Sequence, residues 1–348
     1  MPVKKIPHPT LEERRARGTE SRSGTPLAAH AGWEVASDRP DPVVLLEEQN
    51  TTREQDLVPV RHGRMMASPF TFYRGAAKIM AADLKDTPRA GLNAQLCGDA
   101  HLSNFGAFAS PERQLLFDVN DFDETLPGPF EYDVKRMAAS FTIAARNNGF
   151  TKAETRAATR ASVAGYREAM AGFAQMTTME VWYAHQSTDD IMAAVRKGAT
   201  TKRGAKEAKQ TEKLLKKART RDSLQALSKL GELVDGEYRI VSQPPMIIPQ
   251  RELAATYGLS PTEVERGVRE QFRAYRATLE DDRRHLLERF RFLDLARKVV
   301  GVGSVGTRAF IVLLQGRDQQ DPLFLQGQGG DEIGLRGPSA EEPVQAPR

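Results

Sequence analysis

The stretch LCGDAHLSNFG (96–106) places an aspartate, a histidine and an asparagine between two glycines. The preceding segment GLNAQL (91–96) has the composition of a strand that runs into a loop. A second acidic stretch, FDVNDFDE (117–124), follows at the end of another expected strand, LLFDV (115–119). The sequence therefore predicts two carboxylate-bearing loops, each at the end of a strand.

This pairing is typical of phosphoryl-transfer chemistry. An aspartate accepts or orients the proton of the attacking hydroxyl, and an asparagine on the same loop holds a metal ion. We therefore predict Asp99 as the catalytic base and Asn104 as a metal ligand. A carboxylate at a strand end can bind magnesium that bridges phosphates, so the second stretch supplies Asp121 as first choice, with Asp118 and Asp123 as further candidates. Aspartate and asparagine are also the commonest turn residues, which leaves a purely structural alternative.

Both stretches resemble segments of known enzymes. GDAHLSN (98–104) resembles the catalytic loop of aminoglycoside phosphotransferases and related kinase-like enzymes, with Cys97 in place of their leading histidine. Asp121-Phe122-Asp123 stands where a kinase has Asp-Phe-Gly. PFEYDVKRMAAS (129–140) is similar to the helix that follows in those enzymes, which implies a structural role for Asp133. The resemblance implies an α+β, protein-kinase-like fold with a mostly helical larger lobe, and ATP and Mg²⁺ as cofactors.

A glycine-rich stretch lies far downstream, at 301–306, and fits G-x-G-x-x-G. It runs into the strand-like segments TRAFIVLLQG (307–316) and DPLFLQ (321–326), whereas a dinucleotide-binding motif would run into a helix. We predict a loop over nucleotide phosphates, and its position after Asp99 predicts a circularly permuted kinase-like fold. The predicted nucleotide contacts are Gly301, Gly303, Ser304, Gly306, Arg308 and, from an earlier helix, Arg74, for which a salt bridge is the alternative.

Residues 33–326 as a whole resemble a bacterial family known as domain of unknown function 2252. The resemblance rests on RHGRMMASPFTFYRGAA, LCGDAHLSNFGAFASPER, FDVNDFDETLPGPFEYDVKRMAAS and VVGVGSVGTRAFIVLLQGRD. It implies a continuation after FLQ close to Val-Lys-Glu-Ala, whereas this chain reads GQGG, which one extra nucleotide would produce. We expect 327–348 to be a disordered, frameshifted tail that truncates the small lobe and leaves this chain weakly active or inactive; a genuine disordered terminus is the alternative.

The expected organisation has four parts: a flexible lead-in (1–30), a catalytic-lobe-like domain with a helical insertion (31–296), a partial nucleotide-lobe β segment (297–326) and the tail. Helices are predicted from Ser68, over 129–146, from Thr151 and from Ser260, where helix-start signals occur. The apolar face formed by Val163, Tyr166, Met170 and Phe173 is predicted as core.

Length, composition and net charge limit the kinds of partner that the sequence predicts. With 348 residues, 40% hydrophobic content and a net charge of +4, the chain has an ordinary globular composition and no argument for nucleic acid. The sequence has no apolar run of membrane-spanning length and no secretory signal, so we predict a cytoplasmic protein without a membrane partner. The basic segment 197–221 is either a solvated helix face or a patch for an anionic partner.

Taken together, the residues predict an ATP- and magnesium-dependent phosphotransferase that acts on a small molecule or a protein. The acceptor, and the choice between phosphoryl and nucleotidyl transfer, stay open. Two alternatives also stay open: a metal-dependent phosphoesterase, and a catalytically inactive kinase-like protein that binds a partner.

Overall fold

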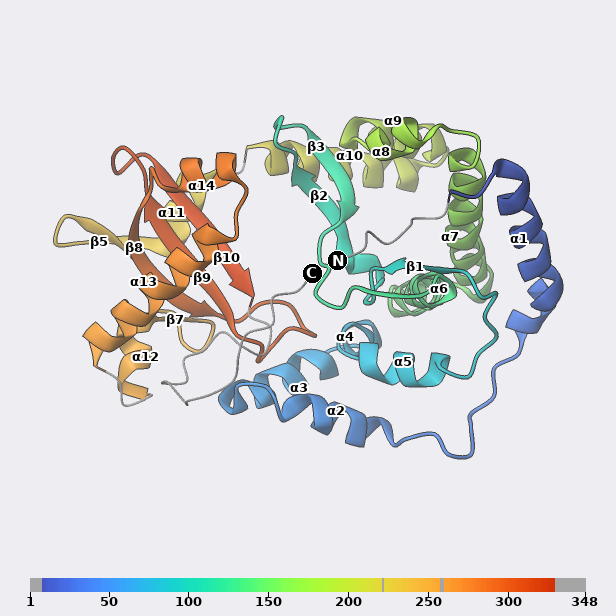
Figure 1. Ribbon diagram of the computed structural model, residues 1–348, viewed down its shortest axis with the longest axis horizontal. Coiled ribbons are helices and arrows are strands. Elements are labelled where there is room, and N and C mark those ends of the chain that lie inside the picture. The colour runs from blue at the N-terminus through green and yellow to red at the C-terminus, as the bar shows by residue number, and fades with distance from the viewer. Residues whose placement is uncertain (1–7, 221, 257–259, 329–348) are drawn as a thin grey trace. The chain divides into compact units, whose positions relative to one another are not determined.

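The computed structural model describes residues 8–220, 222–256 and 260–328, and the chain divides into two compact units (Figure 1). Unit 1 comprises Met1–Gln49 and His62–Arg219, and unit 2 comprises Asn50–Arg61 and Thr220–Arg348. Each unit is described by itself. This division differs from the boundary expected at 296/297, because the β strands near the C-terminus share one core with elements that begin near residue 223.

Unit 1 is mainly helical and carries two small antiparallel hairpins. Its helices are α1 (Leu11–Gly24), η1 (Leu27–Ala31), α2 (Pro42–Asn50), α3 (Val58–Met66, which begins in unit 2), α4 (Pro69–Arg74), α5 (Ala77–Leu84), η3 (Leu102–Asn104), α6 (Glu131–Asn147), α7 (Lys152–Phe173), α8 (Thr178–Tyr183), α9 (Thr188–Gly198) and α10 (Lys202–Arg219). Its strands are β1 (Asn93–Leu96), β2 (Phe105–Ala109), β3 (Leu115–Val119) and β4 (Leu126–Pro129), which pair as β1–β4 and β2–β3.

Unit 2 is a four-stranded antiparallel sheet with helices and a separate hairpin. Its helices are η2 (Gln55–Leu57), α11 (Ser223–Leu230), α12 (Gln250–Thr256), α13 (Pro261–Ala277) and α14 (Asp281–Leu287). Its strands are β5 (Gly231–Val234), β6 (Glu237–Ile240), β7 (Ile247–Pro249), β8 (Arg291–Lys298), β9 (Ala309–Gln315) and β10 (Pro322–Gln328).

The sheet of unit 2 confirms the expected order of strand, glycine turn, strand, turn and strand. Its strand order is β10-β9-β8-β7, and every neighbouring pair is antiparallel. Side chains of Leu293, Ala296, Ile311 and Leu313 are buried together on this sheet with Leu227 of α11. Alternation along β8 and β9 thus places one apolar face against the helical layer. The mixed α and β character expected from the sequence is confirmed.

Three expectations about unit 1 need correction. The lead-in contains α1, which begins at a capping box formed by Thr10 and Glu13, although the helix buries no side chain. The helix expected from Ser68 through residue 84 is two helices, α4 and α5, separated at Gly75 and Ala76. A Cβ atom at Gly75 would lie 2.7 Å from Met65 Sδ, so the position favours glycine. The close approach at Gly75 was hidden because it depends on Met65, whose position is known only when the neighbouring backbone is known, whereas the Thr10/Glu13 pattern is local and readable from the sequence itself.

The face of α7 expected in the core is the third correction. Val163, Tyr166, Met170 and Phe173 keep 41%, 39%, 48% and 36% of their surface exposed. Tyr166 stacks on Phe130 with ring centroids 6.2 Å apart. Helical periodicity shows which side chains share a face, but it does not show whether another element covers that face.

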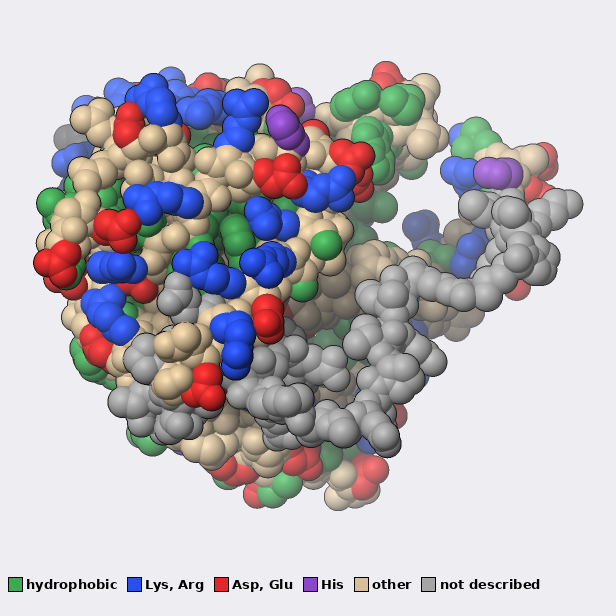
Figure 2. Space-filling view, turned by 60° about the vertical axis from the view of Figure 1, so that its left-hand side comes forward, with side chains coloured by type: hydrophobic (Ala, Val, Ile, Leu, Met, Phe, Trp, Pro, Cys, Tyr) green, Lys and Arg blue, Asp and Glu red, His purple; other side chains and the backbone are tan. Residues whose placement is uncertain are grey.

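The basic segment forms α10, and part of its charge is neutralised within unit 1. Lys216 and Arg196 both pair with Glu212, and Arg219 pairs with Asp189 at 2.6 Å. Figure 2 shows mainly a face of unit 2, where Lys and Arg side chains are likewise interspersed with Asp and Glu. Among the described residues, no helix combines the length and the apolar character that a bilayer crossing requires.

Candidate functional site

The loop after β1 is held by the start of α6. Both carboxylate oxygens of Asp133 accept backbone N–H groups, from Cys97 at 2.7 Å and from Gly98 at 3.1 Å. Gly98 has a φ of +85°, and a Cβ atom there would lie 2.7 Å from the carbonyl carbon of Glu124. Only glycine fits this position, so the loop conformation is set by residues 98 and 133 together.

Asn104 joins the two predicted acidic loops. Its side-chain Nδ2 donates to the backbone carbonyl of Asp99 at 3.2 Å and to that of Asp121 at 3.0 Å. The side chain is buried, and its backbone carbonyl also accepts the N–H of Asn120. Because both acceptors are carbonyl oxygens, the amide nitrogen must face them, and the amide oxygen Oδ1 is left for another ligand.

Asp121 follows β3, and its backbone carbonyl binds the same Asn104 amide group as the backbone carbonyl of Asp99. Its Oδ1 accepts the N–H of Asp123 at 3.3 Å, and burial, followed by the charge of Asp121, raises the pKa of Asp123. Asp118 instead lies within β3, opposite Gly106, and its Oδ1 accepts the N–H of Val119. The structure thus joins Asp99, Asn104 and Asp121 through backbone contacts, with Asp123 beside them, while Asp118 is not part of this hydrogen-bonded group.

Asp99 is paired with an arginine that the sequence analysis did not single out. Arg136 of α6 is buried, and its Nε donates to Asp99 Oδ1 at 2.6 Å, while its Nη2 also contacts that oxygen. The guanidinium lies over the ring of Tyr73, 4.6 Å from the centroid, and Nη2 donates to the Tyr73 carbonyl. In return, the Tyr73 hydroxyl donates to the Arg136 carbonyl at 2.8 Å. This arrangement holds Oδ1 and leaves Oδ2 without a contact to Arg136.

His101 faces that second oxygen. Its Nε2 lies 3.5 Å from Asp99 Oδ2, and its Nδ1 is buried without a hydrogen-bond partner among the described residues. Burial lowers the pKa of His101, although the nearby Asp99 charge opposes this, and Arg136 and Arg74 lower it further. Among the described residues, Arg74 forms no ion pair, so the salt-bridge alternative for it finds no support there.

The pKa of His101 has a measurable consequence. A group whose pKa is lower in the folded state stabilises the fold above its unfolded value, roughly 6.5. That stabilisation is lost as pH falls through the folded value, so the free energy of unfolding should decrease below about pH 6.5. Urea unfolding at several pH values, in metal-free buffer and followed by tryptophan fluorescence, measures this because Trp33 and Trp182 both lie in unit 1. His101→Gln should lose this pH component, whereas the exposed His185→Gln should keep it; an unchanged slope in the His101 variant would contradict the assignment.

Cys97 contributes no nucleophile at neutral pH. Burial, followed by the charges of Asp133 and Asp99, raises the pKa of the thiol to about 11. Its Sγ lies 3.8 Å from Asn104 Nδ2 and 3.9 Å from the Asp121 carbonyl. The thiol therefore fills the space between the two acidic loops as a neutral group.

The predicted glycine turn lies in unit 2, between β8 and β9. Gly301 and Gly306 have φ values of +64° and +87°, whereas Gly303 is not among the residues with positive φ. Val302 and Val305 are buried, and Val305 packs with Leu57 and Val299. The turn is thus anchored by two inward-facing valines between its glycines.

Residues 50–61 bind the glycine turn through hydrogen bonds and ion pairs. Glu54 N–H donates to the Gly306 carbonyl at 2.8 Å, and Arg53 Nη1 donates to the Val305 carbonyl at 2.6 Å. Arg308, predicted to contact phosphate, pairs with Glu54 at 3.5 Å, and the buried Arg297 pairs with Asp56 at 2.7 Å. Ser304 accepts two hydrogen bonds from Thr307 through its carbonyl. The structure places the predicted residues 301–308 together, in a different unit from the acidic loops.

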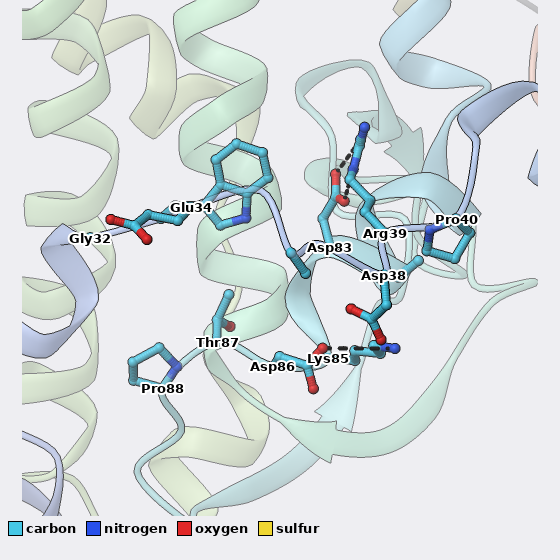
Figure 3. A pocket seen from close by; sticks show the side chains of 13 residues that line it. Gly32, Glu34, Asp38, Arg39, Pro40, Asp83, Lys85, Asp86, Thr87 and Pro88 are labelled. Atoms are coloured by element: carbon cyan, nitrogen blue, oxygen red, sulfur yellow. Dashed lines mark hydrogen bonds and ion pairs between the residues drawn. The ribbon is translucent and has the colours of Figure 1, made fainter.

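A separate cavity in unit 1 involves none of the predicted site residues. Its volume is about 110 Å³, and it lies between the segments 32–40 and 82–88 (Figure 3). Arg39 crosses it to form two hydrogen bonds with Asp83, at 2.6 and 2.9 Å. Lys85 lies 3.7 Å from Asp86 at the opposite side. These two ion pairs account for both cations that line the hollow, whereas Glu34 and Asp38 line it without an ion pair among the described residues.

The sequence of residues 53–328 matches the model of one protein family, described as an uncharacterized protein conserved in bacteria (DUF2252). The chain belongs to this family. The DUF2252 match includes both acidic loops, α6 and the glycine turn, which supports the resemblance read from the sequence. Among curated proteins and solved structures, none matches the chain.

Within the described residues, no group of three or more His, Cys, Asp or Glu side chains is placed to hold a metal ion. Two residues that hold these loops escaped the sequence analysis: Arg136, which binds Asp99, and Ser140, whose Oγ accepts the Leu102 N–H at 2.7 Å. The available signal was their spacing of three and seven residues from Asp133, which places all three side chains on one face of the helix. Nothing in the sequence alone shows which loop that helix faces.

Proposed function

We propose that this DUF2252 chain has the site of an ATP- and magnesium-dependent phosphotransferase, built on the loops around Asp99 and Asp121. The observation that carries the proposal is the Asn104 side chain, which hydrogen-bonds the backbone of both aspartates at once. A kinase-type site needs one aspartate that faces the acceptor hydroxyl and another that faces the metal, and the Asn104 contacts bring the two loops that would carry them together.

The residues present fit a magnesium ion. Asn104 Oδ1 is directed away from the two carbonyls that its amide nitrogen binds, and Asp121 supplies a carboxylate on the adjoining loop. Mg²⁺ prefers oxygen ligands and is commonly held by one or two protein groups together with substrate phosphates. Asn104 and Asp121 would hold the ion, which when bound neutralises charge on the phosphates.

The chain's own groups orient the acceptor. Asp99 Oδ1 is held by Arg136, so Oδ2 is the atom that can accept a hydrogen bond from an acceptor hydroxyl. His101 Nε2, 3.5 Å from that oxygen, restricts its direction. Proton acceptance by a positioned carboxylate contributes typically about 10²–10⁴-fold to a rate. Arg74, on the last turn of α4, is the candidate phosphate contact from unit 1.

The glycine turn supports the proposal through its backbone N–H groups, which are suited to binding an anion. It joins two antiparallel strands, and among the described residues the N–H groups of Gly303 and Ser304 donate no hydrogen bond. Successive free amides can cradle an anion. That this turn covers the nucleotide phosphates, and that the fold is a permuted kinase, stay predictions.

Magnesium-dependent nucleotide binding tests the proposal. Isothermal titration with ATP should show binding in excess Mg²⁺ and at least ten-fold weaker binding in EDTA. Asp121→Asn should abolish this magnesium dependence, because it removes the carboxylate that is proposed to hold the ion together with Asn104. Asp118→Asn is the matched control, since the same charge is removed from a neighbouring strand position without a contact to Asn104. Equal losses in both variants, or binding that ignores magnesium, would refute the proposed site.

The pairing of Asp99 with buried Arg136 also favours a second candidate, a kinase-like protein that binds nucleotide without turnover. Transfer from radiolabelled ATP to water or to a mixture of small hydroxyl compounds separates the two. Label transfer that Asp99→Asn removes, with ATP affinity retained, supports the enzyme; binding with no transfer under any condition supports the inactive protein.

A further inference from the structure

A strongly cationic cavity lies between α6 and α7, away from the predicted site. Its volume is about 430 Å³, and its charged lining consists of Arg146, Lys152, Arg156 and Arg160. No Asp or Glu is among the residues that line it. Within the described part of the chain, none of these four cations forms an ion pair, in contrast to the cations of α10 described above. Four uncompensated positive charges around one hollow repel one another, and a bound anion would relieve that repulsion.

One buried hydroxyl that lines the cavity has no partner among the described residues. Thr155 is 5% exposed, and its Oγ1 is buried without a hydrogen-bond partner there. A buried hydroxyl without a partner costs roughly 1–3 kcal/mol, so such groups are rare unless a ligand or water satisfies them. Thr142 and Thr159, which bond each other at 2.7 Å, complete the hydroxyl lining.

The spacing of the cations indicates the size of the ligand. Lys152, Arg156 and Arg160 follow one another at intervals of four residues on α7, which places them on one face and spreads them over about 12 Å of helix. A single phosphate group is too short to reach all three. Arg146, at the last turn of α6, faces them from the other helix. The N-terminus of α7 also lies at this end, and its dipole favours negative charge.

The cavity is distinct from the acidic loops. On α6, Arg136 and Ser140 face the loop that carries Asp99, through the contacts with Asp99 and Leu102. Thr142 bonds Thr159 of α7, and two residues along a helix correspond to a rotation of roughly 200°, so it lies on the opposite face. The cavity and the proposed phosphotransfer site are therefore on opposite sides of α6.

We propose that this cavity binds a soluble anion carrying two or more phosphate groups. Arg146, Lys152, Arg156 and Arg160 contact its phosphates, and Thr155 Oγ1 donates the buried hydrogen bond. Phe150, 40% exposed at the rim, supplies the apolar contact for an organic part of the ligand.

Inorganic tripolyphosphate is the probe, titrated calorimetrically against the full chain in EDTA so that magnesium-dependent nucleotide binding does not contribute. Tripolyphosphate should bind at least ten-fold more tightly than inorganic phosphate. The double variant Arg156→Gln/Arg160→Gln should lose at least ten-fold in affinity and keep its fold, because neither arginine forms an ion pair or a side-chain hydrogen bond within the described residues. Lys206→Gln/Lys209→Gln on α10 removes the same net charge elsewhere and should leave the affinity within about two-fold, as expected for exposed distant charges in salt.

Thr155→Val provides an independent readout. It should raise the melting temperature of the free protein, because the unpartnered hydroxyl is removed, and weaken tripolyphosphate binding several-fold. Equal losses in the α7 and α10 double variants would show general charge attraction only and overturn the proposal. So would equal affinity for phosphate and tripolyphosphate, or binding to vesicles that contain phosphatidylinositol bisphosphate with none to tripolyphosphate.

Discussion

Gly98→Ala should destabilise unit 1 by about 3 kcal/mol or more and disorder the loop that carries Asp99. A non-glycine residue at positive φ costs roughly 1–2 kcal/mol, and Gly98 has a φ of +85°. In addition, the new Cβ would lie 2.7 Å from the carbonyl carbon of Glu124 and still closer to its oxygen, and backbone cannot move aside as a flexible side chain can. Relief of that clash must shift the loop away from Asp133, which holds the Gly98 N–H at 3.1 Å.

Gly149→Ala is the matched control for this prediction. Gly149 has a similar φ of +75°, but a Cβ there meets no atom within 4 Å. Gly149→Ala should lower the free energy of unfolding only by the cost of placing alanine at positive φ, about 1 kcal/mol. Urea unfolding followed by tryptophan fluorescence reports on unit 1, which contains both tryptophans. Equal losses for the two alanine variants would mean that Glu124 does not constrain the loop.

Arg136→Met should cost about 3 kcal/mol of unfolding free energy, because removal of one partner leaves a largely buried carboxylate without its counter-ion. The Arg136 side chain is 3% exposed and that of Asp99 22%. The variant also loses the hydrogen bond to the Tyr73 carbonyl and the stacking over its ring. The methionine fills a similar volume, so the loss measures charge and hydrogen bonding more than a cavity.

Two comparisons separate this buried pair from ordinary surface pairing. Arg39→Met breaks a contact in which two guanidinium nitrogens bind the two carboxylate oxygens of Asp83. Asp83 is about as buried as Asp99, but Arg39 is 28% exposed against 3% for Arg136, so water screens this pair more and the loss should be smaller. Combining Arg136→Met with Asp99→Asn should cost less than the sum of the single variants, because the second change removes the unpaired charge. Strict additivity would show that the two side chains do not interact.

Several local sequence patterns predicted their elements correctly. The capping boxes at Thr151 and Ser260 start α7 and α13 where expected, because a capping side chain bonds to backbone only three residues away. The strand LLFDV is β3, and the segments around the glycine turn are β8, β9 and β10. The tail predicted at 327–348 lies outside the described residues from position 329 onward. Residues 327 and 328 are the last two residues of β10.

The acidic loops show where sequence reasoning stops. Asp99, Asn104 and Asp121 were chosen from residue type and position after strands, and the structure joins them through hydrogen bonds to backbone. Arg136 could not be chosen in the same way, because an arginine in an amphipathic helix is normally solvated. Its burial depends on Tyr73 from α4, 63 residues earlier in the chain.

Short-range chemistry was therefore readable from the chain alone: helix starts, the strands, the glycine positions and the choice of Asp99, Asn104 and Asp121. These depend on backbone geometry and on contacts within a few residues. The exposure of the α7 face, the pairing of Asp99 with Arg136 and the cationic cavity between α6 and α7 were decided by tertiary structure. They depend on which surfaces meet across long sequence separations, and periodicity within one element carries no information about its neighbour.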